Sequence, residues 1–158
     1  VKDGQINHNA EIFINDEFYE KQKDKWLHTG DMGIIDQDGY LFIKGRCKNM
    51  ILSSNGQNIY PEEIEDKLNN MPYISESIVI EKEGKLVALI YPDFDLVNEE
   101  KITDEKLDEL MTANLKEINQ QLPAYSQLNT YKLYNEEFEK TPKKSIKRFL
   151  YSASLLDS

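Results

Sequence analysis

Residues 26–65, WLHTGDMGIIDQDGYLFIKGRCKNMILSSNGQNIYPEEIE, contain most of the signals that decide the fold. Two apolar runs, MGII and YLFIKG, flank the turn at residues 36–39, whose final glycine takes a positive φ at little cost. A second glycine turn, Asn55-Gly56, follows the strand-like run at residues 49–53. The sequence therefore predicts two consecutive hairpins, and we interpret the short cationic segment between them as a hinge between two bodies.

The chain after these hairpins alternates helix and strand signals. Pro61 with two following glutamates predicts a helix start, because proline is tolerated at the first position and carboxylates there favour the helix dipole. Pro72 would end that helix, and Thr103 would cap a longer one that Pro123 stops. In this longer helix the apolar side chains recur every three or four residues. Further strands are predicted at residues 11–14, 77–80, 86–91 and 130–134, and a short helix at residues 146–151.

This pattern predicts an α+β fold, a small domain with short β-hairpins and a sheet packed against helices, preceded by a β-rich segment. Apolar residues are 39% of the chain and charged residues 30%, which is typical of a globular protein. The net charge of −10 disfavours nonspecific nucleic-acid binding, because phosphate contacts need surplus basic residues. The single cysteine, Cys47, and the lack of a leader or a membrane-length apolar run favour the cytoplasm.

Several segments offer polar groups of the kind that bind nucleotides or anions. Thr29-Gly30-Asp31 precedes a strand, where a carboxylate could hold a vicinal diol or merely cap backbone amides. Arg46 could contact phosphate or ribose oxygens, and Lys48 could mark a joint whose backbone torsions change between two states. The alternative is an exposed basic loop. The loop that includes Gly56, Gln57 and Asn58 is by itself most simply a hairpin. The lysines at 140, 143, 144 and 147 could supply a mobile cation or a solvated basic surface, while His8 and His28 have no partners at metal-ligand spacing.

The order and spacing of these motifs, together with EKTPKKSIKRFLY at residues 139–151, resemble the adenylate-forming superfamily of acyl-CoA synthetases, peptide-synthetase adenylation domains and luciferases. The forms SSNGQNIYPEEIE and IKRFLY most resemble bacterial long-chain fatty-acid CoA ligases. The resemblance implies that residues 1–46 end a large N-terminal adenylation domain and that residues 47–158 form a mobile lid with its hinge near Lys48. We therefore expect the chain to be a piece of a longer enzyme.

The resemblance also implies a two-step reaction, in which a carboxylate attacks ATP to give acyl-adenylate and pyrophosphate and the CoA thiol then displaces AMP. Asp31, with Thr29, would hold the ribose of ATP, and Arg46 would contact the nucleotide nearby. Gly56, with Gln57 and Asn58, would form the loop that serves the thioester step. Mg²⁺ is expected with ATP, no protein metal site is expected, and peripheral membrane association of the whole enzyme stays open.

One departure concerns the C-terminal motif, in which the family places its adenylation lysine immediately before the isoleucine. This chain has Ser145 at that position. Lys144 is the favoured substitute, with Lys143 and Lys147 as alternatives. The family's phosphate loop and acyl pocket belong to the N-terminal domain, so the chain alone is expected to be inactive.

Two other functions fit the same residues. An aryl-acid or peptide-synthetase adenylation module would take its thiol from a carrier protein. A noncatalytic module would dock the basic segment at residues 140–148 on an acidic protein or an anionic lipid surface. The favoured interpretation remains the C-terminal part of an ATP-dependent long-chain fatty acid–CoA ligase.

Overall fold

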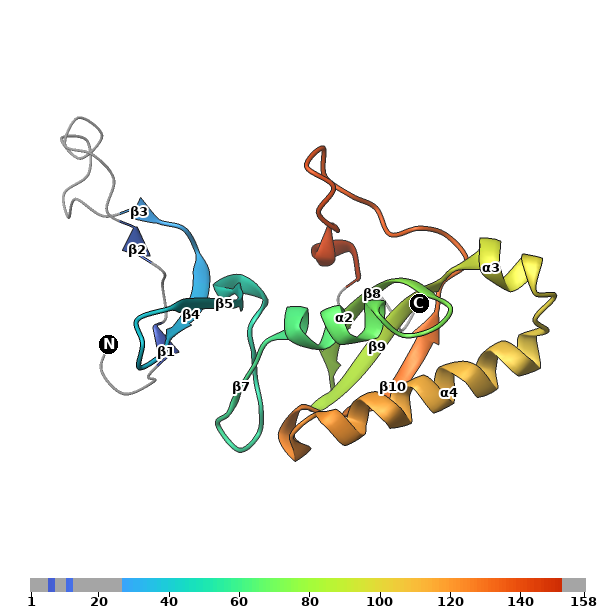
Figure 1. The fold of residues 1–158 in the computed structure, drawn as a ribbon, viewed down its shortest axis with the longest axis horizontal. Coiled ribbons are helices and arrows are strands. Elements are labelled where there is room, and N and C mark those ends of the chain that lie inside the picture. The colour runs from blue at the N-terminus through green and yellow to red at the C-terminus, as the bar shows by residue number, and fades with distance from the viewer. Residues whose placement is uncertain (1–5, 8–10, 13–26, 152–158) are drawn as a thin grey trace. The chain divides into compact units, whose positions relative to one another are not determined.

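The computed structural model describes residues 6–7, 11–12 and 27–151, and the chain divides into two compact units, residues 1–50 and residues 51–158 (Figure 1). The predicted strand at residues 11–14 is seen only as β2, and its second half lies outside the described residues, as does His8. Within the described ranges, no helix combines the length and the apolar character needed to cross a membrane.

Unit 1 is built from short strands. β1 (Ile6–Asn7), β4 (Asp31–Ile35) and β5 (Leu41–Arg46) form an antiparallel sheet in the order β1-β4-β5, and β2 (Glu11–Ile12) pairs with β3 (Leu27–His28). The β4–β5 turn forms because Asp36 Oδ1 accepts hydrogen bonds from the amides of Asp38 and Tyr40, both at 2.9 Å, and Gly39 takes a φ of +87°. The predicted first hairpin is confirmed.

The second hairpin is shorter than predicted. A 3-10 helix, η1 (Cys47–Asn49), occupies the start of the predicted strand at residues 49–53, because the Met50 amide turns back to the Cys47 carbonyl at 3.4 Å. The strand is therefore only β6 (Ile51–Leu52), which pairs antiparallel with β7 (Asn58–Ile59). The glycine turn between them is confirmed.

The sheet of unit 2 has three strands in the order β10-β9-β8. β8 (Ile74–Lys82) and β9 (Lys85–Pro92) form the predicted antiparallel hairpin. β10 (Leu128–Leu133) pairs parallel with β9, which requires a long crossover between the two strands. α4 (Asp104–Gln121) lies in this crossover, and Thr103 Oγ1 caps it by accepting from the Lys106 amide at 3.2 Å, as predicted.

The remaining helices differ in part from the prediction. α2 (Pro61–Asn69) starts with Pro61 as expected but ends before Met71, which packs against the core from beyond the helix. α3 (Phe94–Glu99) was not predicted, although Asp93 is a good cap and accepts from the Leu96 amide at 3.1 Å. The C-terminal helix is a 3-10 turn, η3 (Arg148–Tyr151), because Ile146 instead forms a bridge with Lys140.

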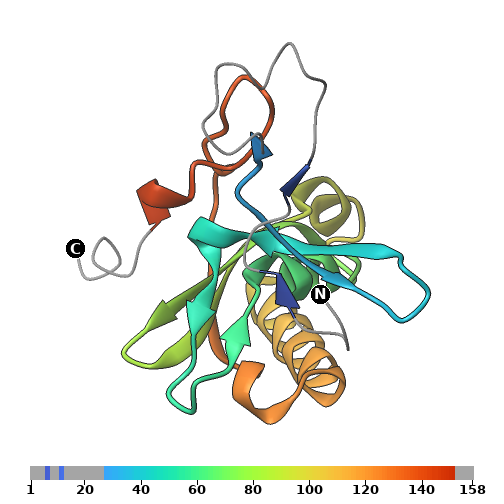
Figure 2. The same cartoon turned by 90° about the vertical axis from the view of Figure 1, so that its left-hand side faces the viewer.

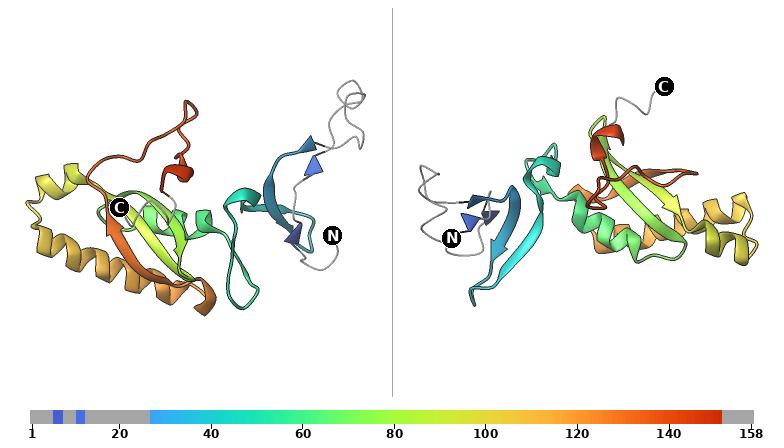
Figure 3. Two further views of the ribbon diagram at one scale, coloured as in Figure 1. Left: turned by 180° about the vertical axis from the view of Figure 1, so that it is seen from behind. Right: turned by 90° about the horizontal axis from the view of Figure 1, so that it is seen from above.

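The two faces of this sheet carry different layers. On one face, α2 and α4 bury apolar side chains against β8 and β9; the core members are Ile64, Leu68, Val79, Ala88, Ile90, Leu107, Met111 and Ile118. On the other face, Ile78 and Leu89 pack against Phe138 from the C-terminal segment. Seen from above, that segment lies on the opposite side of the sheet from α4 (Figure 3). The α+β prediction is confirmed, and the sheet separates the helices from the basic segment.

Candidate functional site

Thr29, Asp31 and Arg46 are brought together at the open end of the β4–β5 hairpin. Asp31 and Arg46 are paired residues of the two strands, and Arg46 Nη1 donates to Asp31 Oδ1 at 2.6 Å. The Asp31 amide donates to Thr29 Oγ1 at 3.2 Å, and the Cys47 amide donates to the Gly30 carbonyl at 2.8 Å. The local ladder therefore fixes the carboxylate and the guanidinium as one group.

This pair retains capacity for a ligand. The Asp31 side chain is 28% exposed and that of Arg46 is 56% exposed. Asp31 Oδ2 takes part in no hydrogen bond with the described residues, so it can accept from a hydroxyl. Gly30 has a φ of +78°, and a Cβ there would lie 3.4 Å from Arg46 Nη2, so glycine suits both the turn and the arginine.

Lys48 is exposed and lies in the middle of η1, the short 3-10 helix that connects β5 to β6. Lys48 is the only basic residue of η1. A short 3-10 turn is a common connector, and its i→i+3 hydrogen bonds are weaker than those of an α-helix. The predicted hinge position therefore lies in a short turn that one long hydrogen bond, from the Met50 amide to the Cys47 carbonyl, closes at 3.4 Å.

The loop between β6 and β7 is closed by its own hydrogen bonds. The Ser53 amide donates to the Gln57 carbonyl at 2.9 Å, the Gly56 amide to the Ser53 carbonyl at 3.0 Å, and the Gln57 amide to Ser53 Oγ at 3.0 Å. Gly56 has a φ of +81° and no atom within 4 Å of a Cβ position. Gly56 and Gln57 are exposed, whereas Asn58 pairs with Leu52 in the ladder. Only the first two are thus at the tip.

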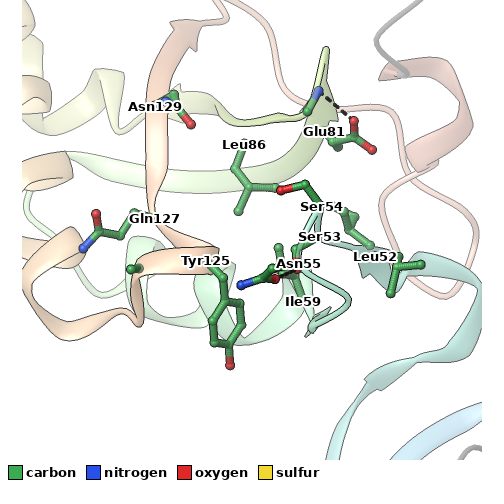
Figure 4. Close-up of a pocket in the computed structure, with 13 residues that line it drawn as sticks. Leu52, Ser53, Ser54, Asn55, Ile59, Glu81, Leu86, Tyr125, Gln127 and Asn129 are labelled. Carbon is green, nitrogen blue, oxygen red and sulfur yellow. Dashed lines mark hydrogen bonds between the residues drawn. The ribbon is translucent and has the colours of Figure 1, made fainter.

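This loop borders a groove of about 430 Å³ in unit 2. Ser54, Asn55 and Tyr125 line it, as Figure 4 shows, together with residues of the β8–β9 turn. The loop and that turn lie at the same end of unit 2 (Figure 2). Amides, hydroxyls and apolar side chains line the groove in similar numbers, and its one charged lining residue is Glu81, so the lining suits a neutral ligand better than an anion.

The basic segment forms a further hairpin, which we call the lysine hairpin (residues 140–146). Lys140 and Ile146 form its bridge, and the Thr141 amide donates to the Ser145 carbonyl at 2.8 Å. The Lys144 amide donates to the Thr141 carbonyl at 2.8 Å, and Lys144 has a φ of +63°. This left-handed conformation is strained for a lysine, so the tip holds an exposed cation in a backbone state that glycine would prefer.

The lysines of this segment are not equivalent. Lys147 Nζ lies 2.6 Å from Glu139 Oε1, and Lys140 Nζ lies 2.5 Å from Glu76 Oε1. The hydrogen bond to Glu76 raises the pKa of Lys140 above its usual range. In contrast, the ammonium groups of Lys143 and Lys144 have no hydrogen-bond or ion-pair partner among the described residues, and both side chains are exposed. Ser145 is exposed beside them.

Sequence reasoning missed the residue that anchors this segment. Glu65, in α2, is only 6% exposed, and its Oε1 accepts from Arg148 Nη1 at 2.7 Å while its Oε2 accepts from Arg148 Nη2. Burial raises the pKa of Glu65, and Arg148 acts in the opposite direction. The two residues are 83 positions apart, so no local pattern pairs them.

Unit 2 has a mixed three-stranded sheet with helices on one face and a cationic hairpin on the other, and it follows a small sheet that ends in an Asp–Arg pair. This arrangement is that of the C-terminal region of an adenylate-forming enzyme. A model of the family described as the AMP-binding enzyme C-terminal domain matches residues 48–154. The chain belongs to this family.

Two of its relatives are named as fatty-acid ligases that differ in the thiol acceptor, CoA in one and an acyl-carrier protein in the other. It is 44% identical over 84 residues to the long-chain fatty acid–CoA ligase FadD13 of Mycobacterium tuberculosis, covering 50% of this chain and 16% of that protein. It is 46% identical over 67 residues to the fatty acid–[acyl-carrier-protein] ligase ScoC of Streptomyces coeruleorubidus, covering 42% of this chain and 13% of that protein. The chain therefore spans less than a fifth of the length of these curated relatives.

Among solved structures, the anthranilate CoA ligase AuaEII in complex with anthranoyl-AMP superimposes with a TM-score of 0.75 at 26% identity. The superposition covers 99% of this chain and 30% of that chain. The match thus includes unit 1 as well as the residues that the family model covers.

Proposed function

We propose that this chain is the C-terminal part of an ATP-dependent acyl-CoA synthetase that acts on long-chain fatty acids. The observation that carries the proposal is the lysine hairpin, because it presents Lys143 and Lys144 without a partner among the described residues on a domain of this family. Adenylation develops negative charge on phosphoryl oxygens, and a cation delivered to that charge lowers the barrier. The similarity to FadD13 supports the choice of acid.

Lys144 is the proposed source of this cation. It lies at the tip of the hairpin, and its side chain need not break an ion pair to move. Lys143 is the nearest alternative. Lys147 would first have to leave Glu139, which lies 2.6 Å away, so we place it third. Ser145, at the position where the family has its lysine, offers only a hydroxyl.

The Asp31–Arg46 pair is the proposed nucleotide contact of unit 1. Asp31 Oδ2 would accept from the ribose hydroxyls of ATP, Thr29 would hold the Asp31 amide in place, and Arg46 would contact the nucleotide nearby. Mg²⁺ would enter with ATP. Since the described residues contain no cluster of three or more metal-ligating side chains, we assign no residue of this chain to it.

The Gly56 loop and Lys48 would serve the second half-reaction. A lid can present first the lysine hairpin and then the Gly56 loop to one bound intermediate only if it rotates, and Lys48 in η1 is the proposed pivot. Gly56, Gln57 and Asn58 would then border the path of the CoA thiol. The partner in this rotation would be the N-terminal adenylation domain of the same enzyme, in the cytoplasm, where the free thiol of Cys47 would stay reduced.

A second candidate is an aryl-acid or carrier-protein-dependent adenylation module, which the similarities to AuaEII and ScoC favour. The third candidate, a docking module without catalysis, is less well supported. Lys140, Lys147 and Arg148 all lie in ion pairs with carboxylates of the same unit, so most of the charge in the basic segment is already neutralised.

Pyrophosphate exchange in the whole protein that contains this chain tests the proposal. Palmitate and anthranilate are compared as acids, and CoA and a phosphopantetheinylated carrier protein as thiols. Exchange that depends on palmitate, followed by thioester formation with CoA, is the expected result. Preference for anthranilate or for the carrier protein would establish the second candidate, and no exchange with either acid would contradict the proposal. The 158-residue chain alone is the negative control.

A further inference from the structure

Glu65 occupies a position that its helix alone does not explain. It lies in the middle of α2, on the side that faces β8, and both of its carboxylate oxygens are used. Oε1 accepts from the Val79 amide at 2.7 Å and from Arg148 Nη1 at 2.7 Å, and Oε2 accepts from Arg148 Nη2. A buried carboxylate with a bidentate arginine is strongly restricted in orientation.

These contacts connect the two faces of the sheet around its edge. β8 is an outer strand, and Val79 pairs with Ala88 of β9 on its inner side only. Glu65 comes from the helical layer, whereas Arg148 comes from the C-terminal segment whose aromatic residues cover the opposite face. Glu65 therefore ties the segment that carries the lysine hairpin to the helical layer.

The tie acts directly on the lysine hairpin. Arg148 follows the returning arm by two residues, and its amide donates to the Ile146 carbonyl at 2.9 Å. The outgoing arm is held at its other end, where Lys140 Nζ lies 2.5 Å from Glu76 of β8. Two ion pairs to adjacent elements thus set the direction in which the tip leaves the body of unit 2.

Stability alone is a weak reason for such a pair. Taking a carboxylate and a guanidinium out of water costs free energy that their attraction only partly returns, and apolar replacements of buried ion pairs are often neutral or better. The raised pKa of Glu65 agrees with this, because burial outweighs the effect of Arg148. Fixed geometry is what the pair contributes beyond packing.

We propose that Glu65 is a positioning residue that acts through Arg148 to hold the tip of the lysine hairpin in the orientation used for adenylation. The role in adenylation rests on the proposed function, whereas the positioning of the tip does not. The two parts are therefore tested with separate measurements.

The first measurement follows the tip without using activity. Trypsin cleaves after Lys143 and Lys144 only when the tip can adopt an extended conformation. In the whole protein that contains this chain, Glu65→Gln is expected to speed cleavage at these two bonds by about tenfold, because the tip loses one of its two ties. Asp66→Asn removes the same charge from the next, exposed residue of α2 and is expected to leave the rate unchanged.

The second measurement separates the half-reactions. Glu65→Gln is expected to lower kcat for palmitate-dependent pyrophosphate exchange by about tenfold with little change in the KM for ATP, because a misplaced cation weakens the transition state more than substrate binding. Thioester formation from preformed palmitoyl-adenylate should stay within about twofold. Arg148→Met should have the same effect, and the double variant should lose no more than either single one.

Unchanged cleavage in Glu65→Gln would overturn the positioning role. Faster cleavage with equal losses in both half-reactions would overturn the link to adenylation and leave a general structural role. Faster cleavage in a protein whose wild type shows no exchange with any acid would instead contradict the proposed function, while the positioning of the tip would stand.

Discussion

The two loops of unit 2 are built on different principles. The Gly56 loop is closed by hydrogen bonds among residues 53–57, and nothing packs within 4 Å of the Gly56 Cβ position. The lysine hairpin closes itself as well, but its arms are fastened to α2 and β8 by Glu65 and Glu76. The conformation of the Gly56 loop is therefore determined by residues within the loop, whereas the lysine hairpin is held in place by residues far away in the sequence.

The aromatic residues reinforce this contrast. Tyr134, Phe138 and Tyr151 pack in a trio with ring centroids 5.0–5.7 Å apart, and the Glu139 amide donates to Tyr151 Oη at 2.8 Å. This trio lies beneath the lysine hairpin and has no counterpart at the Gly56 loop among the described residues. Under the proposed function, such rigid support suits a loop that must aim one charge, whereas a loop that borders the path of the CoA thiol needs only its shape.

The largest expected effect is at the tip of the lysine hairpin. Lys144→Gly allows the left-handed backbone that Lys144 adopts and removes the charged side chain, so a loss of activity cannot come from added backbone strain. Under the proposed function we expect pyrophosphate exchange to fall by about a hundredfold, with thioester formation from acyl-adenylate little changed.

Lys143→Ala and Lys147→Ala are the matched controls for this prediction. Each should reduce exchange less than Lys144→Gly. A greater loss in either one would move the adenylation role to that lysine, and a greater loss in Lys147→Ala would show that an ion-paired lysine can be the mobile cation. Equal retention of activity in all three variants would contradict the proposed role of this hairpin.

A smaller effect, on the other half-reaction, is expected at the Gly56 loop. Gly56→Ala places a side chain at a φ of +81°, where no contact forbids it but the backbone is strained by about 1 kcal/mol. We expect thioester formation to fall several-fold while pyrophosphate exchange stays unchanged. Gly39→Ala, at a φ of +87° in the β4–β5 turn of unit 1, introduces the same strain in a turn that belongs to neither loop and should leave both half-reactions intact. Loss of pyrophosphate exchange in Gly56→Ala would contradict the prediction that the two loops serve different half-reactions.

The smallest effect concerns the anchor itself. Because burial raises the pKa of Glu65 above its ordinary value of 4.5, the folded state holds that proton more tightly than the unfolded state. The contribution of this carboxyl to the free energy of unfolding is therefore fully present below pH 4.5 and is lost as the pH rises through the raised pKa. Arg148 and Glu62 are the charged groups that act on it.

Urea denaturation of wild type and Glu65→Gln across this range measures the effect. The difference in free energy of unfolding should shift in favour of the variant as the pH rises from about 4 to about 8. A difference that is constant with pH would show that Arg148 fully compensates the burial of the carboxylate.

The contrast between the loops also explains what could be predicted from the sequence. The Gly56 turn and the β4–β5 turn were predicted because glycine and aspartate determine such turns within a few residues. Pro61 at the first position of α2 and the cap Thr103 before α4 predicted the two helix starts for the same reason. The ends of these elements were less accurate, as with α2 and β6, because tertiary contacts decide where they stop.

The supports of the lysine hairpin could not be found in this way. Glu65 resembles any other glutamate in the first turns of a helix, and Arg148 resembles one more cation of a basic segment. Their pairing depends on the parallel addition of β10 and on the path of the segment that follows it, neither of which leaves a periodic signal. The candidate lysines were visible in the sequence, but the ion pair that distinguishes Lys147 from its neighbours was not.

The contact between Glu65 and the Val79 amide also has a consequence for the behaviour of this protein at high concentration. An outer strand with open amides is a template on which another chain can add, and this is a common start of aggregation. At Val79 the amide is already occupied, and the Arg148 side chain covers the carboxylate from the same side. The residue that aims the hairpin thus also closes part of the sheet edge to intermolecular pairing.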